Sequence, residues 1–257
     1  MTSSARFGPP ARPANRAAYA GLHTVRAGLV CLAAVALGAC TVHQPTHPEL
    51  ATVAQQGDSL ALSDALEGLI ATGADTTRDR MYAYQVVSER KADTAANAFA
   101  RAAITGRVVQ SKGLSAAGRV REVEEYAIRS RELDPNFRDG AATRLLGTLY
   151  VMAPASLLEH GDSETGLEML EQLAVAAPQV PENHLRLAEA YVTLHDPEPA
   201  RPHLCFSLAH QDALRKDDQA LLKWLIADAG PLDCPRPPGA PRPAAGGTGS
   251  TAPPAGR

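Results

Sequence analysis

The sequence predicts an all-α fold made of paired helices, arranged as an α-solenoid or a compact α-α superhelix. Apolar residues recur at the spacing of one helix face, as at Leu62, Leu66, Leu69 and Ile70. No stretch of the sequence alternates apolar and polar residues as a half-buried strand does. Glycine and proline breakers divide the pattern into about eight or nine helices with short connections. These breakers are Gly73, Gly113, Asp134-Pro135, Ala153-Pro154, Pro178 and Pro197.

The helical pattern occupies residues 58–230, and about 170 residues are enough for one domain with a substantial core. The spacing seen near its start returns at Leu167, Leu170, Leu173 and Ala174. Only 4% of the residues are aromatic, whereas alanine is abundant. We therefore expect the helices to approach one another closely.

An internal repeat is visible in the second half of this domain. In the tetratricopeptide (TPR) pattern of 34 residues, helix A carries Leu-Gly or Leu-Ala followed by Tyr, and helix B carries a small residue and ends before Pro. If Pro181 starts a unit, these positions are Leu187, Ala188, Tyr191 and Ala200. Pro178, at the end of the preceding unit, gives the same register.

The preceding unit starts near Gly140 and has Leu146, Gly147 and Tyr150 at the corresponding positions. It is about seven residues longer than 34, and the excess lies in "MAPASLLEHGD", between its two helices. "RELDPNF", residues 131–137, matches the end of an earlier helix B. The small residues let helices A and B cross closely, so the pattern predicts stacked helical hairpins.

The N-terminal segment predicts an export signal. From Ala27 to Leu37 the chain is uncharged but too short to span a bilayer, which needs about 20 residues. Arg16 and Arg26 precede this run, and residues 1–40 contain no acidic residue. Leu37-Gly38-Ala39-Cys40 resembles a bacterial lipobox, which implies that Cys40 is lipidated. Secretory cleavage without lipid and a buried hairpin helix remain as alternatives.

This interpretation divides the chain into four parts: a cleaved signal (1–39), a lipidated Cys40 with a flexible tether (40–57), the helical domain (58–230) and a disordered tail (231–257). Because Thr41 rather than Asp follows the cysteine, similarity to Gram-negative lipoproteins implies an outer-membrane anchor facing the periplasm. The tail is rich in Pro and Gly and cannot form a packed core.

Charge argues against nucleic-acid binding. Loss of residues 1–39 removes four arginines and no acidic residue, which leaves 21 basic and 28 acidic residues and a net charge of −7. Affinity for nucleic acid depends on Lys and Arg that neutralise phosphates. We therefore expect a protein partner and the membrane, and no nucleic acid.

Two thiols remain once Cys31 is removed with the signal and Cys40 is acylated. Cys205 lies within a predicted helix and Cys234 follows the last one. In an oxidising compartment they would form a disulfide that holds the last helix against its neighbour. The alternative is two independent small apolar residues.

The stretch from about 93 to 208 resembles the TPR-like lipoproteins related to the T component of TRAP transporters. "YAIRSRELDPNF", "GAATRLLGTLYVMAP" and "HGDSETGLEMLEQLAVAAPQVPENHLRLAEAYV" carry this resemblance, together with the lipobox. It covers under half of the chain. It implies a lipid-anchored periplasmic protein, accessory in some members to a solute-binding protein or transporter.

The sequence contains no signature of catalysis. Nucleophile-elbow, zinc-protease, C-x-x-C and P-loop patterns are missing from it. His203, Cys205 and His210 have spacings that put them on different sides of a helix, so we expect no metal site there. Glu122, Glu124 and Glu125 lie among arginines and predict a salt-bridged exposed helix face. We therefore expect a non-enzyme without a cofactor.

Helical-repeat proteins bind partners through the concave surface, which helix A lines. The register assigns ten residues to it: Ala141, Arg144, Thr148, Val151, Met152, Glu182, Leu185, Glu189, Val192 and Thr193. We expect the partner, an amphipathic helix or strand, to contact five of these: Arg144, Met152, Leu185, Glu189 and Val192. Two alternatives remain open, a closed bundle without a ligand here and a carrier that holds a small apolar ligand between its helices. A homo-oligomer is compatible with either.

Overall fold

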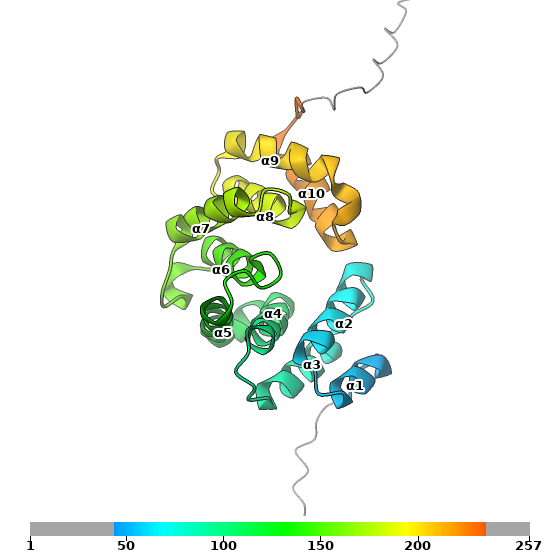
Figure 1. Ribbon diagram of the computed structural model, residues 1–257. Helices are drawn as coiled ribbons and strands as arrows, with labels where there is room; N and C mark the ends of the chain where they lie inside the picture. The colour runs from blue at the N-terminus through cyan, green and yellow to red at the C-terminus, as the bar shows by residue number, and fades with distance from the viewer. Residues whose placement is uncertain (1–43, 235–257) are drawn as a thin grey trace, which may run out of the picture. The chain divides into compact units, whose positions relative to one another are not determined.

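The all-α prediction is confirmed. Residues 44–234 are the part of the chain that the computed structural model describes, and they form ten α-helices, three short 3-10 helices and no strand (Figure 1). The first five α-helices are α1 (Pro48–Gln55), α2 (Ser59–Thr72), α3 (Thr77–Glu89), α4 (Ala95–Lys112) and α5 (Val120–Leu133). They are followed by α6 (Ala141–Met152), α7 (Ser163–Ala176), α8 (Pro181–Thr193), α9 (Pro197–Ala209) and α10 (Lys216–Ala229). The 3-10 helices are η1 (Gly113–Arg119), η2 (Ala155–Leu157) and η3 (Gln211–Ala213). None of the described helices is long and apolar enough to cross a membrane.

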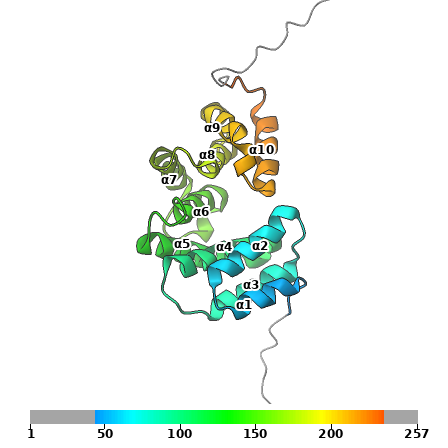
Figure 2. The same ribbon diagram turned by 45° about the vertical axis from the view of Figure 1, so that its right-hand side comes forward.

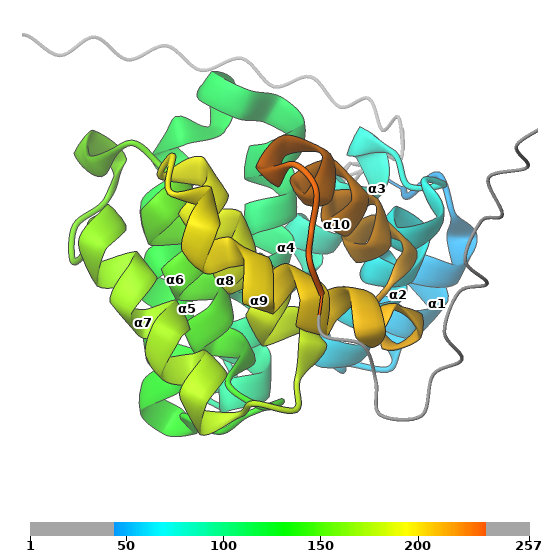
Figure 3. The same ribbon diagram turned by 90° about the horizontal axis from the view of Figure 1, so that it is seen from above.

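Neighbouring helices pack in pairs, α4 with α5, α6 with α7 and α8 with α9. In two views, α5, α7 and α9 lie on the outer side of the curve that these pairs form, and α4, α6 and α8 lie on its inner side (Figures 1 and 2). The last helix, α10, packs against α8 and α9 and also meets α2 from the other end of the domain (Figure 3). The described helices therefore form a superhelix that α10 closes.

Several helix boundaries follow from local chemistry. Asp58 caps α2 by accepting the backbone N–H groups of Leu60 and Ala61, and Thr94 and Asp162 cap α4 and α7 in the same way. Gly73 ends α2 in the left-handed conformation, at φ 69°, which favours glycine. Prolines occupy the first turn of α1, α8 and α9, where a missing N–H costs no hydrogen bond.

The core consists of four apolar clusters that follow the chain. They join α1 to α4, α4 to α6 with Leu158, α6 to α8, and α8 to α10. Most residues that the repeat register places between the helices are buried, whereas Tyr191 is only partly buried. The buried ones are Leu146, Gly147, Tyr150, Leu187, Ala188 and Ala200. Each hairpin therefore packs on the next through the positions that the register singles out.

The prediction of a flexible tether over 40–57 is wrong for its second half. Residues Pro48–Gln55 form α1, and Leu50 is fully buried against α2 and α3. Leu50, Val53 and Ala54 have helical spacing and face this cluster. Three apolar residues in a stretch that contains prolines are too few to predict a helix from the sequence. Residues 1–43, and with them the predicted signal and Cys40, lie outside the described residues.

The predicted tail begins too early. Leu232 packs against the cluster of α8, α9 and α10, and the carbonyl of Pro231 accepts a hydrogen bond from Arg201. The remaining tail, 235–257, lies outside the described residues. Within residues 58–230 the structure has nine α-helices, α2 to α10, in agreement with the eight or nine predicted, and the tenth, α1, lies in the predicted tether.

Candidate functional site

The five residues predicted to contact a partner do not form one surface. Leu185 and Val192 are buried, with exposed fractions of 0% and 6%, and belong to the cluster that α8 forms with Leu204, Leu222 and Leu225. Their assignment to a binding groove is wrong because α10 folds back over this side of α8. The two matched repeat units do not include α10, so the register could not place it.

The other three residues, Arg144, Glu189 and Met152, make contacts of three different kinds. Arg144 donates from Nη1 to Oδ1 of Asn183, 2.5 Å away, and Glu189 pairs with Arg186 at 2.8 Å. Met152 is 52% exposed and accepts a hydrogen bond from the hydroxyl of Thr193. Only Met152 therefore offers an exposed apolar side chain.

A network of ion pairs lies where α10 meets the rest of the domain. Arg215 at the start of α10 pairs with Glu67 of α2, which Arg107 of α4 also contacts at 2.5 Å. Arg186 of α8 reaches Asp218 of α10, also at 2.5 Å. Burial opposes the charge of Glu67, but the two arginines hold its pKa below its ordinary value. The network holds α10 against α2 and α8. Because its charged groups already pair with one another, we do not assign a binding site to it.

Glutamates 122, 124 and 125 do not share one exposed face, contrary to the prediction. Glu124 is 1% exposed and accepts the backbone N–H groups of Glu159 and His160, at 2.8 and 2.7 Å. Glu122 accepts from Arg101, and Glu125 alone is exposed. Glu124 thus holds the long loop between α6 and α7, a role that requires tertiary contacts and leaves no local pattern.

An open pocket of about 520 Å³ lies on the outer side of the domain between α7, α8 and α9. Its lining residues are Glu171, Ala174, Val175, Pro178, His184, Leu187, Tyr191 and His203. Leu187 and Ala174 form a buried floor, whereas Val175 at the edge is 80% exposed. We call this pocket the outer groove. The sequence pattern does not indicate this groove, because the repeat register points to the concave positions of helix A and not to the outer faces of the helices.

Two imidazoles lie side by side in the outer groove. Nδ1 of His184 is 2.8 Å from Nδ1 of His203, and Nε2 of His184 lies 2.9 Å from the carbonyl oxygen of Pro178. Since a carbonyl only accepts, neutral His184 carries its proton on Nε2, and His203 donates from Nδ1 to His184. Burial, together with the neighbouring His184, lowers the pKa of His203.

The rings of the outer groove continue into a ladder along α8 and α9. Tyr191 stacks on His203 with ring centres 6.3 Å apart, His184 lies 4.1 Å from Phe206, and Phe206 stacks on His210 at 4.2 Å. The hydroxyl of Tyr191 donates to Oε1 of Glu171, and burial with this carboxylate raises the pKa of Tyr191 to about 12. Among the described residues no hydrogen bond or ion pair uses Oε2 of Glu171, and the residue is exposed.

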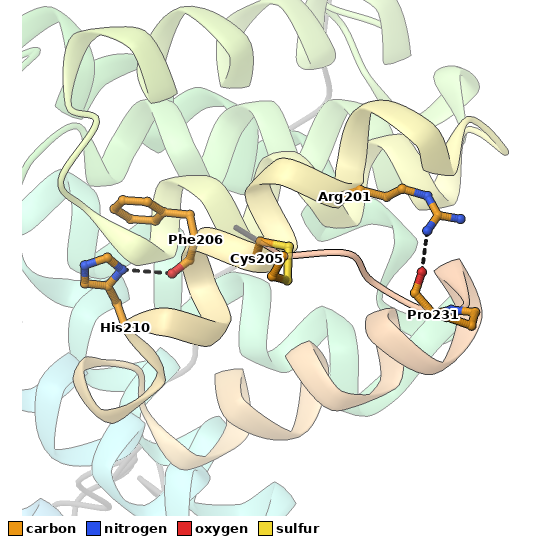
Figure 4. Close-up of a disulfide and its surroundings, with 6 residues drawn as sticks. Arg201, Cys205, Phe206, His210 and Pro231 are labelled. Carbon is orange, nitrogen blue, oxygen red and sulfur yellow. Dashed lines mark hydrogen bonds between the residues drawn. A yellow bond between two sulfur atoms is a disulfide. The ribbon is translucent and has the colours of Figure 1, made fainter. Parts of the chain in front are cut away.

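The structure contains the disulfide that the sequence left open. Cys205 of α9 and Cys234 are bonded, with Cα atoms 5.3 Å apart (Figure 4). Nearby, Arg201 donates to the Pro231 carbonyl and His210 to that of Phe206 (Figure 4). Cys205 is therefore unavailable to a metal, and no group of three or more His, Cys, Asp or Glu in residues 44–234 could hold one.

Comparison with known proteins adds nothing to this geometry. No protein-family model matches the chain, and no curated protein matches it.

Proposed function

We propose that this chain is a lipid-anchored periplasmic binding scaffold, a helical-repeat protein that holds a protein partner at the membrane. The observation that carries this proposal is the outer groove. It has an apolar floor, an exposed valine, aromatic and imidazole rings and a carboxylate at its edge. Aromatic side chains around a desolvated centre are typical of protein-protein contacts.

The openness of the outer groove favours a macromolecular partner over the alternative, a carrier of a small apolar ligand. Pockets for small molecules bury most of the ligand surface. The outer groove runs along the surface between α7 and α9 and leaves Val175 and Glu171 in solvent. A peptide segment can cover such a surface while one of its sides stays in water.

The proposed location comes from the lipobox and is supported by the disulfide. Disulfides persist in oxidising compartments such as the bacterial periplasm. Acylation of Cys40 would supply more than one lipid chain, which stable anchoring requires. By resemblance to the T-component lipoproteins, the partner is a periplasmic solute-binding or transporter protein. Cys40→Ser should release the chain from membranes or block its maturation, and unchanged fractionation with membranes would contradict the anchor.

Binding through the outer groove is tested with two matched substitutions in α7. Val175→Asp places a charge at the edge of the groove, whereas Ala176→Asp places the same charge on an exposed neighbour that does not line it. Envelope proteins captured by the wild-type chain should be lost with Val175→Asp and retained with Ala176→Asp. Equal capture by both variants would remove the outer groove as the binding site.

A further inference from the structure

We propose that the outer groove recognises an arginine-bearing proline-rich segment, and that residues 239–243 of the same chain, Gly-Ala-Pro-Arg-Pro, occupy it. This inference rests on the proposed function, since it identifies the chemistry of the segment that the outer groove binds.

The surface of the outer groove suits proline. Extended proline-rich segments form a polyproline II helix, whose rings dock between aromatic side chains at low entropic cost. Tyr191 and His203 present stacked rings at one side of the groove, and the half-buried ring of His184 continues the surface. Pro178 and Val175 complete an apolar rim. These residues provide slots for proline rings and no enclosed cavity.

The charge at the edge of the groove suits arginine. Glu171 uses Oε1 to accept the hydroxyl of Tyr191, and this bond fixes the carboxylate beside the rings. Its Oε2 makes no hydrogen bond or ion pair with the described residues, and because Glu171 is exposed this oxygen can accept an N–H of a guanidinium. Arg242 lies between Pro241 and Pro243, so a proline on either side of it can pack while its side chain reaches the carboxylate.

The covalent geometry places this segment within reach. The disulfide fixes Cys234 on α9 at Cys205, two residues from His203. Two residues are about 200° apart around a helix, so the outer groove lies on the opposite side of α9. Half the circumference of a helix about 10 Å wide is about 16 Å. About five extended residues cross that distance, and the sixth to ninth residues after Cys234 are 240–243.

The same geometry provides a matched control. Arg236 is the second residue after Cys234 and is too close to the disulfide to reach the outer groove. Arg242 and Arg236 each lie between two prolines, so the same substitution at the two positions changes the same charge in the same local sequence.

The experiment uses the full chain with a photoreactive benzoyl-phenylalanine at Val175, which is 80% exposed and therefore tolerant of a larger side chain. After irradiation, mass spectrometry should identify a cross-link to residues 239–243 in a product of monomer size. Arg242→Glu should reduce the yield roughly fivefold, as expected for loss of a partly exposed ion pair, and Arg236→Glu should not. Glu171→Arg combined with Arg242→Glu should restore the yield.

Three results would overturn the inference. A product of dimer size would assign the segment to a second copy of the chain, equal yields for the two arginine variants would remove the carboxylate contact, and no cross-link would remove the segment from the outer groove. If the probe at Val175 captures another envelope protein but never residues 239–243, the proposed function stands and this inference fails.

Discussion

Gly147 of α6 and Gly166 of α7 lie against each other where the two helices cross, so that backbone meets backbone. A Cβ atom on Gly166 would lie 2.7 Å from the carbonyl oxygen of Gly147, and one on Gly147 would lie 2.8 Å from Cγ of Leu170. Real Cβ atoms do not approach other atoms this closely. The hairpin of α6 and α7 therefore depends on glycine at both positions.

Gly166→Ala should destabilise the domain by about 1–3 kcal/mol, because the added methyl group must push the two backbones apart. Urea unfolding followed by circular dichroism measures this change. Gly68→Ala is the matched control, since no atom lies within 4 Å of a Cβ built on that residue in α2. It should stabilise the domain by about 0.5–1 kcal/mol, the usual gain from replacing a helical glycine. Two destabilised variants, or none, would contradict the role assigned to the crossing.

The sequence was sufficient to predict core residues where the packing is between neighbouring hairpins. Leu146, Gly147 and Ala188 could be placed in the core because each hairpin repeats the contacts of the previous one at a fixed spacing. It was not sufficient for α10, which lies outside the repeat and packs against α2 far away in the chain. Because α10 covers Leu185 and Val192, these two residues are buried in the core and not on the surface where the register predicted them.

The sequence indicates single residues of the outer groove, but it does not indicate how they contact one another. The spacing of His203 from Cys205 and His210 indicates no metal site, and the contact of His203 with His184 is visible only once α8 and α9 lie side by side. Glu124 illustrates the same limit, because it looks like any solvated glutamate until the loop at 159–160 folds over it. Helical spacing indicates which face is buried, but it does not indicate what covers the face.

Glu124→Gln should loosen the loop between α6 and α7. The carboxylate accepts two backbone N–H groups in a site with no access to water, whereas an amide has one acceptor oxygen and leaves one of them unpaired. Such a loss costs about 1–3 kcal/mol. Hydrogen exchange of the Glu159 and His160 amides should accelerate. Glu125→Gln, on the exposed neighbour, should leave both amides protected, and equal protection in the two variants would show that the carboxylate does not hold the loop.

Reduction of the Cys205–Cys234 bond should lower the thermal stability of the C-terminal helices. The bond joins residues 29 apart in the sequence, and closing a loop of that size in the unfolded chain contributes about 3.6 kcal/mol in the chain-entropy model. Cys205→Ser with Cys234→Ser should therefore melt earlier than the oxidised wild type and no longer respond to dithiothreitol. A wild-type melting temperature that is unaffected by the reductant would contradict this prediction.

The contact between His47 and Asp79 should make the N-terminal part of the domain sensitive to pH. Asp79 at the start of α3 is fully buried and accepts the N–H groups of Thr46 and His47, at 2.7 and 3.0 Å, and Nδ1 of His47 at 2.9 Å. Burial opposes its charge, but the hydrogen bonds from Thr76 and His47 lower its pKa to about 2. The hydrogen bond with Asp79 raises the pKa of His47.

These shifts act at opposite ends of the pH range. Asp79 titrates near 3.8 when unfolded, so its contribution is complete above about pH 4 and is lost as the pH falls toward 2. The contribution of His47 is complete below 6.5 and is lost as the pH rises through its raised folded pKa. Hydrogen-exchange protection of α1 should therefore be greatest between about pH 4 and 6.5.

Asp79→Asn tests this coupling, because an asparagine keeps the size of the side chain and loses the charge. It should lower stability at pH 5 by about 2 kcal/mol, the equivalent of the shift at Asp79, and flatten the pH profile on both sides. Asp58→Asn is the control, since asparagine caps a helix as well as aspartate does, and the side chain of Asp58, the N-cap of α2, accepts only from Leu60 and Ala61 among the described residues. It should keep the wild-type profile. If the pH profile of Asp79→Asn retains its maximum, other groups hold α1 in place and the pair of Asp79 with His47 does not cause the pH dependence of stability.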